Sequence, residues 1–181
     1  MKYFKKMVGK KVYLSPVNTE DYEIYTKWMN DFKVTDGIGV STKIYTLEKE
    51  KEHLNNKALS KDYTFSIVSL ETDELLGNCS LFEVDTIKGI ATVGIMIGEE
   101  ENRGKGYGSD ALRLLISYAF DYLNLHNLML VVFSFNKIAI NAYKNVGFKE
   151  FGRRHEAILL KGKYYDDIYM EILESDYRKE D

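Results

Sequence analysis

Gly94-Ile-Met-Ile-Gly98 and the nearby Arg103-Gly-Lys-Gly-Tyr-Gly108 carry the strongest fold signal in this chain. The first segment ends a run of strand composition, residues 90–97, and the second leads directly into an amphipathic helix. Glycines let the backbone of such a turn approach a ligand, and the first-turn N–H groups of a helix lack intrahelical partners. Because the helix dipole adds positive potential at the same place, the turn predicts an anion site suited to phosphate. Arg103 and Lys105 would add charge there.

Two other phosphate-binding motifs do not fit this turn. A P-loop needs G-x-x-x-x-G-K-[ST], a string that occurs nowhere in the chain. A Rossmann fingerprint needs G-x-G-x-x-G within a βαβ unit, whereas the spacing here is G-x-G-x-G and strands joined by short turns precede it. The spacing therefore excludes both motifs. A turn that uses its glycines only for backbone conformation stays open as the alternative.

The rest of the chain surrounds this turn with alternating strand and helix signals. Short turns between consecutive strand-like runs predict an antiparallel meander. The apolar run 128–134 has the composition of a central strand covered on both faces, and residues 36–39 have that of a mobile loop. The element order β-α-α-β-β-β-α-β-α-β-β predicts an α+β fold with a mixed sheet. The expected strands are residues 11–14, 63–70, 75–84, 90–97, 128–134, 148–160 and 163–173, and the expected helices are 18–28, 46–59, 109–122 and 137–146.

Composition narrows the class of protein. With 181 residues, 45% of them hydrophobic and 29% charged, the chain is expected to form a single globular domain over 1–181. Its net charge of −3 argues against a general nucleic-acid binder. Cys79 is the only cysteine and the three histidines are far apart in sequence, so neither a disulfide nor a metal site is expected. The absence of a signal-peptide core or an apolar membrane span predicts a cytoplasmic protein with no membrane partner.

The glycine turn resembles a family motif. Arg103-x-x-Gly106-x-Gly108 is similar to the acyl-CoA pyrophosphate loop of GNAT N-acetyltransferases, written [Q/R]-x-x-G-x-[G/A]. The segment 94–98 resembles that family's fourth strand, which splays from the next strand and hydrogen-bonds the pantetheine arm. The resemblance therefore implies the GNAT fold, with a mostly antiparallel sheet, helices on both faces, and acetyl-CoA as cosubstrate. It implies cofactor contacts by Ile95, Met96, Ile97, Arg103, Gly104, Lys105, Gly106, Tyr107, Gly108 and Ser109.

A second motif lies about thirty residues downstream. The stretch from Asn136 to Phe148 resembles the GNAT pattern N-x-x-A-x-x-x-Y-x-x-x-G-F at every fixed position. In that family the asparagine holds the pantetheine amide and the tyrosine hydroxyl sits near the CoA sulfur. The resemblance implies that Asn136, Ala139 and Tyr143 contact the cofactor and that Tyr143 is the general acid. Core packing of Tyr143 and helix capping by Asn136 are the structural alternatives. The resemblance covers residues 63–173 well and the first third loosely.

The general base is missing from its usual positions. GNAT relatives carry a glutamate at positions that fall here on Thr92 or Val131, and neither residue can take a proton from an ammonium. Glu83 is the candidate base. A water chain from Asp85 or a backbone carbonyl could replace it as the base. Glu83 could also be an ordinary solvated strand residue with no role in catalysis. His155 offers a proton relay if it is not simply a surface histidine. Cys79 is expected to be a small buried hydrophobe.

The acceptor is the least specified part of the prediction. The segments 14–21 and 162–170 resemble the GNAT branch that contains ribosomal-protein N-terminal acetyltransferases and spermidine acetyltransferases. Acidic residues expected near the acceptor favour a cationic small molecule such as a polyamine; they are Asp31, Asp36, Glu83 and Asp85. A protein N-terminus is the rival acceptor, and a non-catalytic acyl-CoA sensor is the rival function. The sequence does not decide the oligomeric state; relatives are often dimers, so the resemblance allows a homodimer.

Overall fold

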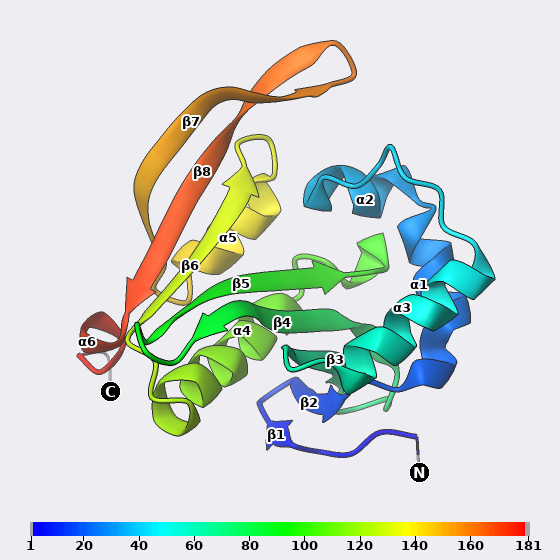
Figure 1. Cartoon of the computed structure of the whole chain (residues 1–181), viewed down its shortest axis with the longest axis horizontal. Helices are drawn as coiled ribbons and strands as arrows, with labels where there is room; N and C mark the ends of the chain where they lie inside the picture. The colour runs from blue at the N-terminus through cyan, green and yellow to red at the C-terminus, as the bar shows by residue number, and fades with distance from the viewer. Residues whose placement is uncertain (1, 180–181) are drawn as a thin grey trace.

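The computed structural model describes residues 2–179, which are built around one mixed sheet of eight strands (Figure 1). The spatial order is β1-β2-β3-β4-β5-β6-β8-β7, and every neighbouring pair is antiparallel except β5 with β6. The strands are β1 Met7–Val8, β2 Val12–Pro16, β3 Tyr63–Ser69, β4 Leu75–Asp85, β5 Ile90–Ile97, β6 Asn127–Phe133, β7 Lys149–Leu160 and β8 Lys163–Leu173. The predicted α+β class and the antiparallel meander are confirmed.

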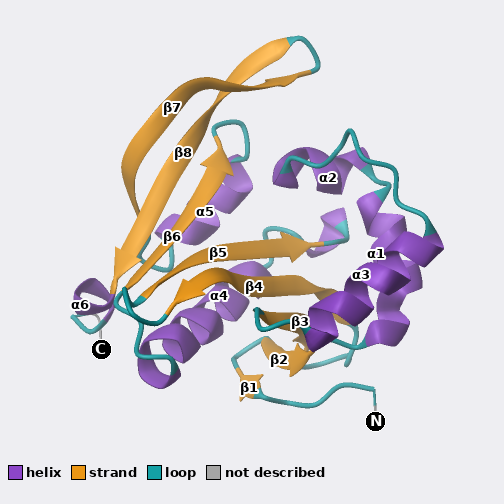
Figure 2. Ribbon diagram, in the orientation of Figure 1, coloured by secondary structure: helices purple, strands orange, loops and turns teal. Residues whose placement is uncertain are grey.

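Helices cover both faces of the sheet (Figure 2). One core cluster joins α4 and α5 to one face through residues such as Leu112, Ile140 and Val93, and a second joins α1 and α3 to the other through Trp28 and Leu54. The helices are α1 Tyr22–Met29, α2 Phe32–Ile38, α3 Leu47–Leu59, α4 Tyr107–Ser117, α5 Lys137–Lys144 and α6 Glu174–Tyr177, with a π-helical turn at Tyr118–Tyr122 after α4. None of the helices within residues 2–179 is long and apolar enough to cross a membrane.

The helix starts follow from local capping. The Thr46 side chain accepts a hydrogen bond from the Lys49 N–H at the start of α3, and Asn136 caps α5 by accepting from Ala139 N–H. Asp31 caps α2 in the same way, and Gly39 ends that helix in a left-handed conformation with φ 75°. The prediction of a mobile loop at residues 36–39 is therefore wrong, because this segment forms the last turn and the C-terminal cap of a helix.

Strand β6 is covered on only one of its faces. On β6, Leu128, Leu130 and Val132 are buried, but Val131 on the opposite face is 42% exposed. The prediction that this strand is covered on both faces is wrong. The physical reason is that β5 and β6 separate part-way along their length and leave an opening that the described residues do not fill.

Candidate active site

The opening between β5 and β6 is the central feature of the site. The two strands pair only at Ile90–Asn127, Ala91–Leu128 and Thr92–Met129 and then diverge. Beyond that point their outer edges still pair with β4 and β8, but within residues 2–179 the facing edges have no strand partner. A cavity of 1210 Å³ enters there, lined by residues 93–97 of β5 and 131–133 of β6. Backbone groups without ladder partners line such a cavity as ready donors and acceptors for a ligand.

The glycine turn lies at one end of this cavity. Gly106 is the N-cap of α4 at φ 87°, and no side chain in the described part of the chain caps the helix, so its first-turn N–H groups are available to an anion. Lys11, from the turn between β1 and β2, brings an ammonium group to the same place. Its Nζ donates to the Lys105 carbonyl at 2.6 Å and would lie 3.4 Å from a Cβ on Gly106. The turn therefore has the free N–H groups and the positive charge that a phosphate requires.

A buried carboxylate fixes the position of this helix start. Asp110, in the first turn of α4, is 7% exposed and accepts hydrogen bonds from Lys11 N–H at 2.7 Å and Val12 N–H at 3.1 Å. An acidic group near a helix N-terminus is also favoured by the helix dipole. Asp110 thus ties α4 to the beginning of β2 and holds Lys11 beside Gly106.

The downstream motif contributes the other wall of the cavity. Tyr143 is 6% exposed, lines the cavity and packs edge-on against Phe148 with ring centroids 5.9 Å apart. Burial raises the pKa of the Tyr143 hydroxyl to about 12, so the phenol stays protonated at neutral pH and can donate a proton. Asn136 lines the cavity as well as capping α5, and Gly37 of α2 approaches its amide nitrogen so closely that a Cβ there would lie 3.2 Å away.

Comparison with known proteins identifies the family to which this chain belongs. Residues 11–149 match the family model described as "Acetyltransferase (GNAT) domain". The chain belongs to the GNAT family of acetyltransferases. It is 33% identical over 129 residues to the spermidine N(1)-acetyltransferase of Vibrio cholerae, covering 71% of this chain and 74% of that protein. An uncharacterized N-acetyltransferase, p20 of Bacillus licheniformis, is 27% identical over 167 residues, or 91% of this chain and 93% of p20.

Solved structures agree with the GNAT assignment. The crystal structure of the Vibrio cholerae spermidine N-acetyltransferase in complex with CoA and spermine superimposes with a TM-score of 0.82 and 25% identity, covering 92% of this chain and 98% of that one. A GNAT acetyltransferase of Bacillus anthracis gives a TM-score of 0.81 at 18% identity, covering 93% and 98%. GNAT enzymes use acetyl-CoA, and this chain is an N-acetyltransferase of that family.

Within this GNAT frame, the structure brings together most of the predicted site residues. The cavity is lined by Ile95, Met96, Ile97, Arg103, Gly104, Gly106, Gly108, Ser109, Asn136, Ala139 and Tyr143. Lys105 and Tyr107 do not line it. The Lys105 side chain is exposed while its carbonyl accepts from Lys11, and the Tyr107 ring packs against the hydrophobic core. Only the backbone of these two residues is placed to serve the turn.

Arg103 has a different set of partners from the predicted phosphate. Its guanidinium donates to three carbonyls: Ile97 at 3.2 Å, Gly98 at 3.0 Å and Lys33 of α2 at 2.8 Å. The side chain therefore joins the end of β5 to α2, and a direct contact between Arg103 and phosphate stays a prediction.

We expect Arg103→Ala to destabilise the protein by about 2 kcal/mol, because three carbonyls lose a charged donor. Urea unfolding of the variant against wild type measures this free energy. Arg154→Ala, at an exposed arginine of β7, is the matched control and is expected to change stability by less than about 0.5 kcal/mol. Similar losses in both variants would contradict the proposed bracing role.

The two carboxylates predicted as sources of the general base, Glu83 and Asp85, do not line the cavity. Glu83 sits at an irregularity of β4 with φ 51° and accepts a hydrogen bond from the Thr92 hydroxyl at 3.2 Å, but it is not among the cavity-lining residues. Asp85 accepts from the N–H groups of Ile87 and Lys88, and these hydrogen bonds together with the Lys88 ammonium lower the pKa of its carboxyl group. A role for Glu83 in proton transfer stays a prediction. Val131 does line the cavity, where it offers no base.

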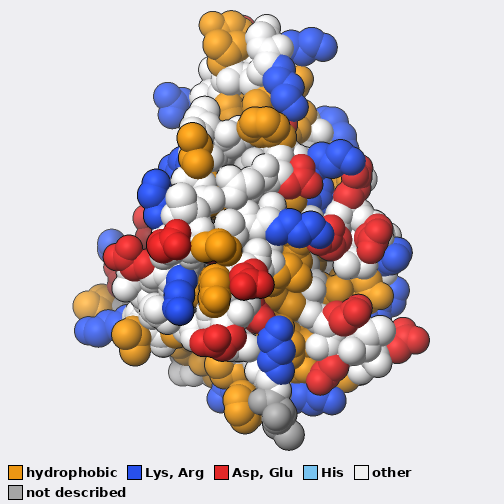
Figure 3. Space-filling view, turned by 90° about the vertical axis from the view of Figure 1, so that its right-hand side faces the viewer, with side chains coloured by type: hydrophobic (Ala, Val, Ile, Leu, Met, Phe, Trp, Pro, Cys, Tyr) orange, Lys and Arg blue, Asp and Glu red, His pale blue; other side chains and the backbone are white. Residues whose placement is uncertain are grey.

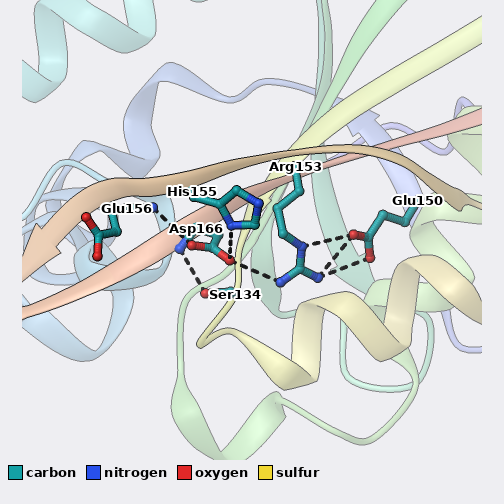
Figure 4. Close-up of polar contacts among 6 residues, drawn as sticks. All are labelled: Ser134, Glu150, Arg153, His155, Glu156 and Asp166. Atoms are coloured by element: carbon teal, nitrogen blue, oxygen red, sulfur yellow. Dashed lines mark hydrogen bonds and ion pairs between the residues drawn. The ribbon is translucent and has the colours of Figure 1, made fainter.

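His155 belongs to a separate polar cluster on the β7–β8 hairpin (Figure 4). Its Nδ1 lies 3.5 Å from the Asp166 carboxylate, and its side chain is 78% exposed. Asp166 also pairs with Arg153 at 3.1 Å and accepts from Glu156 N–H, while its own N–H donates to the Ser134 hydroxyl. None of His155, Arg153 and Asp166 lines the cavity. The cluster holds the two strands together where β7 is irregular. His155 is therefore a surface histidine, as the alternative interpretation stated.

The cavity lining also includes residues that the sequence motifs did not indicate. Glu50, His53 and Lys57, all on α3, line it together with Lys43 and Asp36. Motif reasoning missed them because the first third of the chain matches the family only loosely. One local signal was present: Glu50 occupies a position that helical spacing places beside the buried Leu54.

Only one of the four predicted acidic acceptor residues reaches the cavity. Asp36 lines it, but Lys161 at the β7–β8 turn pairs with Asp36 Oδ2 at 2.7 Å; the other oxygen is buried and, within residues 2–179, has no hydrogen-bond partner. Asp31 caps α2 instead. On the side of the molecule that carries α1 and α3, basic and acidic side chains are interspersed rather than separated (Figure 3).

Proposed function

We propose that this protein transfers the acetyl group of acetyl-CoA to a small primary amine by direct attack. The observation that carries this proposal is the extent of one cavity. Its lining combines the uncapped N-terminus of α4, the diverging strands, Tyr143 and residues of α3. With the pyrophosphate of acetyl-CoA at the start of α4 and the amine beside α3, the thioester and the amine would meet near the Tyr143 hydroxyl.

The chain's own residues account for the main needs of this reaction. The first-turn N–H groups of α4 and the Lys11 ammonium hold the diphosphate. Unpaired N–H groups along residues 93–97 orient the pantetheine arm and stabilise the oxyanion that develops on the thioester carbonyl. Tyr143, protonated because of its raised pKa, supplies the proton that the departing thiolate takes up.

Within the class of small amines, we propose a polyamine such as spermidine as the acceptor. Support comes from the named activity of the Vibrio cholerae relative and from the Glu50 carboxylate, which can attract an ammonium group. Lys43 and Lys57 line the same region and make it less acidic than the sequence led us to expect. The acceptor pocket is therefore suited to one ammonium near Glu50 rather than to a chain of several acidic contacts.

A panel of amines assayed by thiol release tests this proposal. The panel contains spermidine, spermine, single amino acids and short peptides with free N-termini. We expect spermidine or spermine to give the highest kcat/KM. A higher kcat/KM for the peptides would show that the acceptor is a protein N-terminus and not a polyamine. Tight acetyl-CoA binding with no turnover of any amine would instead identify an acyl-CoA sensor.

A further inference from the structure

Glu50 is a buried carboxylate without a side-chain partner in the described part of the chain. It is 3% exposed, and within residues 2–179 its carboxylate makes no hydrogen bond or ion pair with another side chain. Burying a charged group in this way is costly, and elsewhere in this protein buried carboxylates such as Asp21 and Asp110 are paired. Since Glu50 lines the cavity, its carboxylate borders the space where the acceptor is proposed to bind. A group left unpaired at such a place is a candidate for function.

Glu50 and His53 also line a second cavity. This smaller space of 390 Å³ is bounded by Lys43, Ile44, Tyr45 and Lys49 in addition to those two residues. Glu50 and His53 are three residues apart on α3, so they lie on the same side of the helix. They therefore stand at the boundary between the large cavity and the smaller one, and His53 is the more exposed of the two.

We propose that Glu50 takes the proton from the acceptor ammonium and that His53 passes it to solvent through the smaller cavity. This inference rests on the proposed N-acetyltransferase function and supplies the base that Thr92 and Val131 cannot provide.

The charges around the pair favour such a transfer. Burial raises the pKa of Glu50, and partial burial together with the charges of Lys57 and Lys43 lowers the pKa of His53. A glutamate of raised pKa is a stronger base, and a histidine of lowered pKa is neutral near pH 7 and can accept a proton. The other titratable groups that line these two cavities are Tyr25, Lys33, Asp36, Tyr45, Lys49, Arg103, Lys137 and Tyr143.

The proton balance closes with Tyr143. The ammonium gives one proton to Glu50, and the free amine attacks the thioester carbonyl to form the new C–N bond. As the C–S bond breaks, Tyr143 protonates the sulfur, and the second proton of the nitrogen restores the phenol. One proton per turnover thus leaves by way of Glu50 and His53, and no oxidant or further reactant is needed.

Glu50→Gln tests the proposal. We expect kcat/KM for the amine to fall about 100-fold at pH 7, the scale of a lost general base, while acetyl-CoA binding is unchanged. The loss is expected to shrink as the pH rises, because an amine that is already deprotonated in solution needs no base. Glu52→Gln removes an exposed carboxylate from the same helix and is expected to keep the wild-type profile.

Thermal stability separates a catalytic role from a structural one. Because the pKa of Glu50 is raised on folding, the wild type loses stability as the pH rises from the ordinary glutamate pKa of 4.5 through the raised value. Glu50→Gln lacks this loss, so its Tm at pH 7 is expected to equal or exceed that of wild type. A lower Tm accompanied by weaker acetyl-CoA binding would overturn the proposal in favour of a structural role.

His53→Gln gives an independent readout. We expect an intermediate loss of kcat that imidazole added to the buffer restores, because imidazole can carry the proton from Glu50 to water. A wild-type pH profile for Glu50→Gln, or a shifted profile for Glu83→Gln instead, would overturn this inference while leaving the N-acetyltransferase function intact. A wild-type enzyme that acetylates none of the amines would overturn both.

Discussion

Tyr143→Phe is expected to lower kcat by about 100-fold or more while leaving the affinity for acetyl-CoA near that of wild type. The phenyl ring keeps the packing against Phe148 and the shape of the cavity wall. Within residues 2–179 the Tyr143 hydroxyl donates to no other protein group, so its removal costs no internal hydrogen bond. What disappears is the proton that the thiolate takes up as it leaves. The effect therefore falls on the chemical step.

Steady-state thiol release gives kcat, and calorimetric titration gives the acetyl-CoA affinity. Tyr118→Phe is the control, because Tyr118 packs among Tyr63, Phe65 and Tyr122 away from the cavity. Since the pKa of Tyr143 is raised to about 12, its proton is retained below that value, and no loss of kcat from deprotonation of this acid is expected between pH 6 and about pH 10. Equal losses of turnover and affinity in Tyr143→Phe would count against the acid role.

Gly106→Val is expected to weaken acetyl-CoA binding by about 100-fold or more, equivalent to about 2.7 kcal/mol. Gly106 has φ 87°, a conformation that a β-branched residue adopts only with strain. Its Cβ would also occupy space beside the Lys11 ammonium, at the point where the first-turn N–H groups of α4 face a phosphate. The substitution therefore disturbs both the shape and the charge of the anion site.

Variants at two further glycines distinguish the effect of backbone strain from the effect of a side chain that fills the phosphate site. Gly162, at the β7–β8 turn, has φ 77°, and no described residue comes within 4 Å of the position that a Cβ would take, so Gly162→Val carries similar strain at a residue that does not line the cavity. Gly108→Ala would bring its Cβ to 3.7 Å from the Ile95 side chain, an ordinary contact, and is expected to retain binding. If Gly162→Val lost acetyl-CoA affinity as severely as Gly106→Val, general destabilisation rather than the turn would explain the effect.

The sequence alone was enough for the parts of the site that are built locally. The turn from Arg103 to Gly108 and the capped helix from Asn136 to Tyr143 are each formed by neighbouring residues, so their conformation follows from capping, glycine placement and the start of a helix. The strand pattern of residues 63–97 was predictable for the same reason, because alternation and short turns are properties of a contiguous segment.

Only the tertiary structure decided which distant residues share the cavity. Lys11 reaches Gly106 from a distant part of the sequence, since its Nζ bonds the Lys105 carbonyl across a separation of 94 residues. Glu50 and His53 come from the weakly patterned first third, and Glu83 lies outside the cavity although it precedes the turn before β5. Each of these positions depends on how helices and strands pack, and packing sums many weak contacts between segments far apart in the chain. Local sequence patterns contain no information on that packing, so the contributions of Lys11, Glu50 and His53 to the site could not be predicted from sequence.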